Sequence, residues 1–239
     1  DTARPSGEHD DLVRITATLT DPPASPESIE TIESMRSDLG RFGALVGGSI
    51  AKDLDGRAGA ERDLKVIIPL ILLVVVLVLF AVLRSFVTPL VLITINIIST
   101  FAALGLGVLV STHIFKFPAL DISTPIYAFL FLVALGIDYT VFLVLRAREE
   151  SVEHGTVGGM VQAVGLTGGV ITSAGIVLAA VFAVLGVLPL ITLTQVGLIV
   201  SLGILLDTFF VRTLVVPAVF ALVGDKIWWP SALSKRERD

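Results

Sequence analysis

Long apolar runs separated by short polar segments dominate the chain from residue 66 onward. Each is long enough for the ~20 helical residues that cross the hydrocarbon core of a bilayer. Five membrane spans are therefore predicted, at about 66–83, 89–110, 125–145, 169–188 and 193–216. The last run stays apolar past Pro217 to Val223, which is too long for one upright crossing, so we expect a kink or an interfacial segment there. The pattern indicates an all-α bundle of five transmembrane helices.

The first 63 residues follow a different pattern, in which one alternating segment and one short segment broken by Gly47 and Gly48 surround a helical segment. Residues 1–11, DTARPSGEHDD, are typical of a solvated linker. The expected elements are a strand at Leu12–Leu19, a helix capped by Ser25 or Ser28 and ending at Gly40, and a second short strand at Ala44–Ile50. A piece of about 50 residues buries too little core to be stable alone. We expect residues 1–63 to form the end of a larger extracytoplasmic α/β domain.

Composition agrees with a membrane protein, because 54% of the 239 residues are hydrophobic and 16% are charged. The net charge of −5 comes mainly from acidic residues near the N-terminus, so a nucleic-acid partner is not expected. The chain has no cysteine, and its histidines His9, His113 and His154 are scattered, so we expect no metal site and no cofactor. No phosphate-binding glycine motif is found, so we do not expect this chain to hydrolyse ATP.

Basic residues at the ends of the runs predict the orientation of the spans. Arg84, Arg146, Arg148 and Lys226 flank the same side, which the positive-inside rule makes cytoplasmic. The connection 146–168, expected to hold a short surface helix, and the tail 224–239 are then cytoplasmic, and the N-terminal segment lies outside. Nothing in the chain would carry this segment across the membrane. We therefore expect at least one span upstream, in a longer polypeptide.

Small and amphipathic residues predict contacts with neighbouring helices and with the membrane surface. Two stripes with four-residue spacing favour close helix packing: Ser99, Ala103, Gly107 and Ser111 in the second span, and Gly165, Gly169 and Ser173 entering the fourth. Asn96 is interpreted as an interhelical hydrogen-bonding residue, with a ligand role as the alternative. Trp228 and Trp229 suit an interfacial anchor.

Charged side chains inside the apolar runs are the candidate functional residues. Asp138 and Asp207 each lie about 14 residues past the start of an inward-running span, so both can sit at one depth. A charge near a bilayer centre costs at least ~2.5–3.5 kcal/mol, which makes such residues functional candidates. Arg212 lies five residues after Asp207, about 140° around an α-helix, which disfavours an ion pair within that helix. Arg212 is expected to reach another helix or to extend toward the surface.

Two interpretations of these aspartates remain open, a structural hydrogen-bonding group and a member of a proton relay. Two carboxylates at matched depth favour the relay, because desolvation brings carboxyl protonation toward physiological pH. Tyr139 points about 100° away from its neighbour Asp138 and would serve an aspartate on a facing helix.

Several motifs together resemble the second-half membrane domain of the MMPL family, bacterial lipid and drug exporters of the resistance-nodulation-division (RND) superfamily. The matching segments are VGGSIAKDLD, GIDYTVFLVLRAREE, TGGVITSAGIVLAAVFAVLG, LGILLDTFFVRTLVVPA and GDKIWWP. The resemblance covers nearly the whole chain and implies twelve spans in two halves, of which these would be spans eight to twelve. It also implies a proton relay formed by Asp138, Tyr139, Asp207 and Arg212, with an opposing Asp-Tyr pair from the first half.

The resemblance implies a proton-coupled antiporter of the bacterial cytoplasmic membrane that exports lipids or other amphiphilic compounds. Its expected partners are membrane lipids, a hydrophobic substrate, the N-terminal half of the same transporter and further copies in an oligomer. The alternative is an RND-like protein-export helper or a sterol-sensor-like module that senses lipid. An enzyme is not expected, because no nucleophile, base and orienting group occur together.

Overall fold

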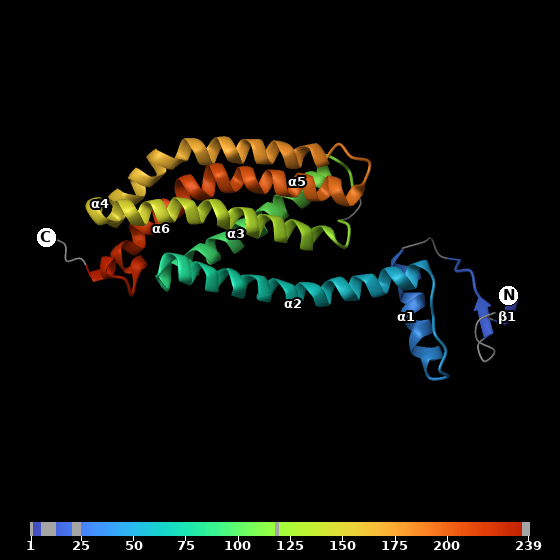
Figure 1. Cartoon of the computed structure of the whole chain (residues 1–239). Coiled ribbons are helices and arrows are strands. Elements are labelled where there is room, and N and C mark those ends of the chain that lie inside the picture. Colours follow the sequence, from blue (N-terminus) through green and yellow to red (C-terminus); the bar gives the residue numbers. More distant parts are fainter. Residues whose placement is uncertain (1, 6–12, 21–24, 118–119, 236–239) are drawn as a thin grey trace. The chain divides into compact units, whose positions relative to one another are not determined.

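The computed structural model describes residues 2–5, 13–20, 25–117 and 120–235 (Figure 1). The chain divides into two units, Asp1–Glu61 and Arg62–Asp239. Among the described residues, both strands lie in the first unit, and the second unit is built from helices. This distribution fits the predicted all-α membrane bundle with a small α/β piece before it.

The first unit contains two strands, the helix α1 and the start of α2. Strand β1 (Thr2–Pro5) pairs antiparallel with β2 (Val13–Thr16), with Thr2 opposite Thr16. The helix α1 (Pro26–Gly40) begins after Ser25, whose hydroxyl oxygen accepts a hydrogen bond from the backbone N–H of Ser28 at 3.2 Å. The predicted cap at Ser25 is confirmed, since this bond satisfies one of the free N–H groups of the first turn.

Two predictions for this unit are wrong. Residues 2–5 form a strand, whereas a solvated linker was expected over residues 1–11, of which residues 1 and 6–11 lie outside the described part of the chain. The expected second strand at Ala44–Ile50 is absent from the described residues, because residues 44–47 are irregular and α2 (Ser49–Leu83) already starts at Ser49. The backbone is turned at Gly48, whose φ of +127° favours glycine.

An arginine holds this irregular segment beside the helices. The Arg36 guanidinium forms two hydrogen bonds to the Asp55 carboxylate, Nη1 to Oδ1 at 2.5 Å and Nη2 to Oδ2 at 2.8 Å. Its Nη2 also donates to the backbone oxygens of Val46 at 3.4 Å and Ala51 at 3.3 Å. The carbonyl of Val46 therefore bonds to a side chain instead of a neighbouring strand, which agrees with the absence of a strand at residues 44–47.

The second unit is a bundle of long helices. After α2 come α3, α4, α5, a π-helical segment η1, the short helix α6 and two 3-10 segments η2 and η3. Their bounds are Val87–His113 for α3, Thr124–Leu185 for α4, Ile191–Leu206 for α5, Asp207–Val215 for η1, Val216–Val223 for α6, Gly224–Trp228 for η2 and Ala232–Lys235 for η3. In the described part of the chain, four continuous helices are long and apolar enough to cross a membrane: Ser49–Leu83, Val87–His113, Thr124–Leu185 and Ile191–Trp228.

The structure has four such helices where five separate spans were predicted, because α4 contains both the third and the fourth predicted span. A helix of 62 residues would be about 93 Å long, three times the thickness of a bilayer core. Within α4, Gly155 has φ 72° and ψ 172°, which are not helical angles, and Figure 1 shows the helix reversing its direction. A separate surface helix was expected between residues 146 and 168. These residues instead continue the third and fourth predicted spans, which meet at Gly155.

The helix α5 packs against both α3 and α4 and has most of its residues buried. One predicted stripe of small residues makes this contact: Ala103 and Gly107 on α3 are buried, and a methyl group added to Gly203 on α5 would lie 2.9 Å from the Ala103 Cβ. The second stripe was predicted on the wrong face of the helix, since Gly165, Gly169 and Ser173 are exposed. The buried stripe of that helix consists of Ala163, Thr167, Ile171, Gly175 and Ala179.

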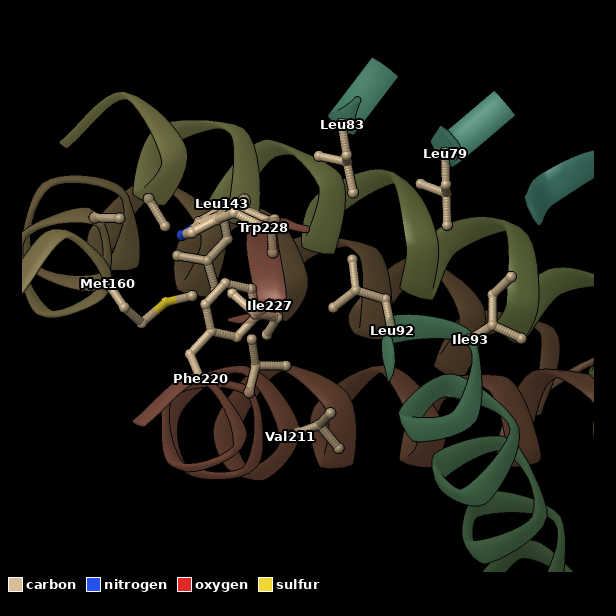
Figure 2. Close-up of a cluster of buried hydrophobic side chains, with 14 of the residues drawn as sticks. Leu79, Leu83, Leu92, Ile93, Leu143, Met160, Val211, Phe220, Ile227 and Trp228 are labelled. Carbon is tan, nitrogen blue, oxygen red and sulfur yellow. The ribbon is translucent and has the colours of Figure 1, made fainter. Parts of the chain in front are cut away.

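The segment η2 packs into the bundle, although residues 224–239 were predicted to form a tail. In η2, the Trp228 side chain is fully buried and was wrongly predicted to be an interfacial anchor, whereas Trp229 is 56% exposed. Figure 2 shows Trp228 and Ile227 within a cluster of apolar side chains from α2, α3, α4, η1 and α6. Residues 236–239 of the predicted tail lie outside the described residues.

Polar contacts fix η2 to two turns of the chain. The Ser85 hydroxyl, between α2 and α3, donates to the backbone oxygen of Ile227 at 2.7 Å. The Thr88 hydroxyl, in the first turn of α3, donates to the same oxygen at 2.7 Å. The Trp228 indole N–H donates to the Thr156 hydroxyl at 3.1 Å, and that hydroxyl donates to Asp225 at 2.5 Å. These bonds join the α2–α3 corner, the α4 reversal and the end of the last span.

Candidate functional site

The site is built on a change of helix type in the last span. From Asp207 to Val215 the backbone is π-helical, with hydrogen bonds between residues i and i+5, whereas α5 before it is α-helical. Residues five apart are therefore stacked along one face of this segment. Asp207 and Arg212 have this spacing, and Arg212 Nη2 is in ionic contact with Asp207 Oδ2. The expectation that they could not pair within the helix is wrong, because it assumed α-helical geometry.

The ion pair is buried. Asp207 is 8% exposed and Arg212 is 4% exposed. Removing two charges from water costs several kcal/mol per ion, so a buried pair requires both mutual attraction and further hydrogen bonds. Arg212 Nη2 also points to the backbone oxygens of Leu135 at 3.5 Å and Gly136 at 3.4 Å on α4. Arg212 thus reaches another helix, as one of the two sequence interpretations proposed.

Tyr139 on α4 completes this arrangement. Its ring lies under the Arg212 guanidinium, with 4.8 Å from the guanidinium carbon to the ring centroid. This distance is within the range of a cation–π interaction, which is strongest where both groups are desolvated. The structure therefore brings three of the four predicted relay residues together: Tyr139, Asp207 and Arg212.

Asp138 is not part of this cluster. Its side chain is exposed on the surface of the described chain and lines neither of the two cavities around Asp207. Since Asp138 and Tyr139 are consecutive on α4, about 100° apart, one of them faces the ion pair while the other faces outward. Tyr139 was expected to serve an aspartate on a facing helix, and its partner here is the arginine of that helix.

A small cavity adjoins the ion pair, and its polar lining includes residues that sequence reasoning did not place in the site. The lining residues are Asn96, Ser99, Thr100, Leu132, Leu135, Gly136, Tyr139, Leu178, Gly203, Ile204, Asp207 and Arg212. Asn96 was noticed as a polar residue in mid-span, but nothing in the sequence linked it to Asp207. Thr100 donates to the Asn96 side-chain oxygen at 3.2 Å. A methyl group added to Gly136 would lie 2.9 Å from the Asn96 nitrogen, so this amide packs directly against α4.

Several polar atoms of the site have no hydrogen-bond partner within the described chain. They are Asp207 Oδ2, which has only the ionic contact, Thr208 Oγ1, and Nε and Nη1 of Arg212. Buried polar atoms are nearly always hydrogen-bonded, and leaving one unpaired costs about 1–3 kcal/mol. The ion pair therefore has hydrogen-bond donors and acceptors that no group of the described chain satisfies. Within the described residues, no three histidine or carboxylate side chains gather where they could hold a metal ion.

Comparison with known proteins identifies the family of the chain. The model of the MMPL family matches residues 10–239. A membrane protein of Streptomyces coelicolor, SCO0839, is 44% identical over 95% of the chain, which covers 33% of that protein. The apo-petrobactin exporter of Bacillus anthracis is 39% identical over 90% of the chain, or 29% of the exporter. The probable transport protein MmpL10 of Mycobacterium leprae is 44% identical over 74% of the chain, or 17% of its own length.

The chain thus spans about a third or less of the length of these relatives. The names of two of them describe transport, which points to a role other than catalysis. The long apolar helices agree with a multi-pass membrane protein. Because the family model covers nearly all of the sequence, the chain belongs to the MMPL family.

Proposed function

We propose that this chain is the second-half membrane domain of an exporter in the bacterial cytoplasmic membrane, driven by the proton gradient. The observation that carries the proposal is the buried Asp207–Arg212 pair beside Tyr139 in an apolar helix bundle. Ionisable groups inside a membrane bundle are expensive and mark ion or proton pathways. A proton that moves down the membrane potential releases ~2.3 kcal/mol per 100 mV, which is enough to bias a conformational equilibrium.

In this mechanism Asp138 takes up and releases the proton. It is exposed on the described chain, so it can face a first half that carries its own Asp-Tyr pair. Tyr139 lies on Arg212 and connects the outward-facing carboxylate to the buried pair. When Asp138 is charged, the positive charge of Arg212 is attracted toward α4, and when it is neutral, Arg212 is drawn to Asp207. Protonation would thereby shift η1 relative to α4.

The substrate is proposed to be a lipid or another amphiphilic compound. The name of the Bacillus anthracis relative says that it exports apo-petrobactin, and the MMPL resemblance favours hydrophobic cargo. Membrane lipids, the first half of the transporter and further copies of it are the proposed partners. No cofactor is proposed, because the proton gradient supplies the energy.

The test of the relay replaces one proton carrier at a time in the complete transporter, reconstituted in proteoliposomes with an imposed pH gradient. Asp138→Asn keeps the shape of the side chain but cannot titrate, so proton-driven transport should be lost while membrane insertion is normal. Tyr139→Phe should reduce transport less. Arg212→Lys should also lose transport, because an ammonium group cannot reproduce the planar contacts of a guanidinium.

The matched control is Asp121→Asn, which makes the same chemical change in the turn before α4, where Asp121 Oδ1 accepts a hydrogen bond from the Ser123 backbone N–H at 3.0 Å. This variant should transport at the parental rate. Parental transport by Asp138→Asn, with equal protein in the membrane, would show that Asp138 is only a structural polar residue.

The proposed orientation has a separate test, which uses the absence of cysteine from the chain. A cysteine at Glu153, which is exposed on α4 just before Gly155, should react with a membrane-impermeant thiol reagent only from the cytoplasmic side. A cysteine at Glu27, exposed in the first turn of α1, should react only from outside. Reaction of both from the same side would contradict the proposed arrangement of spans.

A further inference from the structure

Two cavities share the same pair of residues at the centre of the bundle. Each has a volume of about 10 Å³, close to the smallest space that holds one water molecule. Asn96 and Asp207 line both cavities. Tyr139 and Arg212 line the first cavity, and Thr140 lines the second together with apolar side chains. Asn96 and Asp207 therefore border both spaces.

The polar atoms around these cavities need partners of both kinds. Arg212 Nε and Nη1 are donors without an acceptor in the described chain, and Asp207 Oδ2 has no donor beyond its ionic contact with Arg212 Nη2. The Arg212 side chain is more than nine-tenths buried, so bulk solvent cannot supply these bonds. A group that occupies the first cavity must accept from the guanidinium and donate to the carboxylate.

The chemistry of the lining selects the occupant. An anion would be repelled by the Asp207 carboxylate, and a cation would be repelled by the Arg212 guanidinium. An apolar ligand would leave the donors and the acceptor unpaired. Water both donates and accepts, and its size fits the cavities.

We propose that these two cavities bind ordered water molecules and that Asn96 is the residue that positions them. Its amide offers one donor group and one acceptor group beside both cavities. The amide is oriented by Thr100, which donates to its oxygen at 3.2 Å, and by the close approach of α4 at Gly136. Because Arg212 Nη2 points to the Gly136 oxygen at 3.4 Å, the amide and the guanidinium converge on the same point of α4.

These waters give the ion pair a hydrogen-bonded link to the Tyr139 side of α4. Their part in proton transfer rests on the proposed function, since it requires that the pair belongs to a relay. The presence of the waters does not rest on the proposed function, because it is inferred from the unpaired atoms and the cavities alone.

The experiment is hydroxyl-radical footprinting of the 239-residue chain in lipid nanodiscs. Radicals generated by X-rays from ordered water oxidise the aromatic side chains beside it, and Tyr139 lines the first cavity. Asn96→Leu has a similar volume but cannot bind water, so oxidation of Tyr139 should fall at least about fivefold. Asn96→Asp keeps an acceptor at the same place and should retain the oxidation.

The chain supplies its own controls. Tyr127 is the other tyrosine and is 50% exposed, so its oxidation measures the radical dose in every sample. Thr94→Val alters an exposed residue on the same helix, whose hydroxyl donates to the Leu90 oxygen at 2.8 Å, and it should leave Tyr139 oxidation unchanged. Thr100→Val, which preserves shape, should reduce the oxidation through the loss of amide orientation.

Unchanged oxidation of Tyr139 relative to Tyr127 in both Asn96→Leu and Thr100→Val would overturn the proposal. The measurement needs no proton gradient and no substrate. Failure of the water site is therefore distinguished from failure of the relay, which is tested by transport of the Asp138→Asn transporter.

Discussion

Removing both partners of the buried ion pair should cost less stability than the sum of the losses from removing each partner alone. Arg212→Met keeps much of the side-chain volume but leaves the Asp207 carboxylate 8% exposed without its counter-charge. Breaking a buried pair in this way typically costs about 3–5 kcal/mol, and Asp207→Asn should destabilise similarly by leaving the guanidinium unpaired. The double variant removes both charges, so its loss should be smaller than the sum of the single losses by about 2 kcal/mol.

The assay is equilibrium unfolding of the chain in mixed micelles with increasing sodium dodecyl sulfate. Trp228 is fully buried against Phe220, with ring centroids 5.6 Å apart, so its fluorescence should report loss of the bundle. A Trp229→Phe background removes the exposed tryptophan signal. Thr213→Val, at an exposed position of the same π-helical segment, should change the unfolding free energy little. Additive effects of the two single changes would refute the view that the charges stabilise one another.

Three further changes test the packing and the extracytoplasmic unit. Gly203→Ala places a methyl group against Leu132 and should destabilise the bundle by about 1–3 kcal/mol in the same unfolding assay. Thr156→Val removes the hydroxyl that joins η2 to the α4 reversal and should cost about 1–3 kcal/mol, because an indole N–H and a carboxylate lose their buried partner. The hydrogen bond from Arg36 lowers the pKa of Asp55 below its usual 3.8. This contact therefore stabilises α1 fully above pH 3.8, and the stabilisation is lost as the pH falls through the lowered pKa. Amide hydrogen exchange of α1 should become faster in that acidic range, and Arg36→Gln should abolish this pH dependence.

The membrane bundle was predictable because apolar runs of about 20 residues have few alternatives to a spanning helix. Gly155 shows the limit of that approach, since its neighbours continue the helical pattern and only its φ of +72° marks the reversal. The strand expected at Ala44–Ile50 failed for a related reason. Its apolar residues suggested a strand, but the segment is interrupted by Gly47 and Gly48, and the backbone oxygen of Val46 accepts a hydrogen bond from the Arg36 side chain.

The candidate site was only partly predictable. Asp207, Arg212 and Tyr139 were identified as charged or polar residues in apolar runs, but their contact depends on the π-helical geometry of η1. A rotation of 100° per residue places Asp207 and Arg212 on different faces, so α-helical reasoning excluded the pair that forms. Asn96 was visible as a mid-span amide, whereas its position at two cavities depends on how α3 packs against α4 and η1.

The wide turns of η1 also affect how the chain can change in length. In an α-helix, deletion of one residue rotates everything downstream by about 100°, which would turn the face of α6 that carries Phe220 away from α4. Within η1 a deletion can be absorbed by tightening the hydrogen bonds from i→i+5 to i→i+4, so that the following residues keep their faces. Loss of Thr208, for example, would leave Asp207 and Arg212 four residues apart, the spacing of neighbours on one face of an α-helix. The end of the span would stay in place. The segment is therefore a point in the last span where a residue can be lost without unpacking the residues after it.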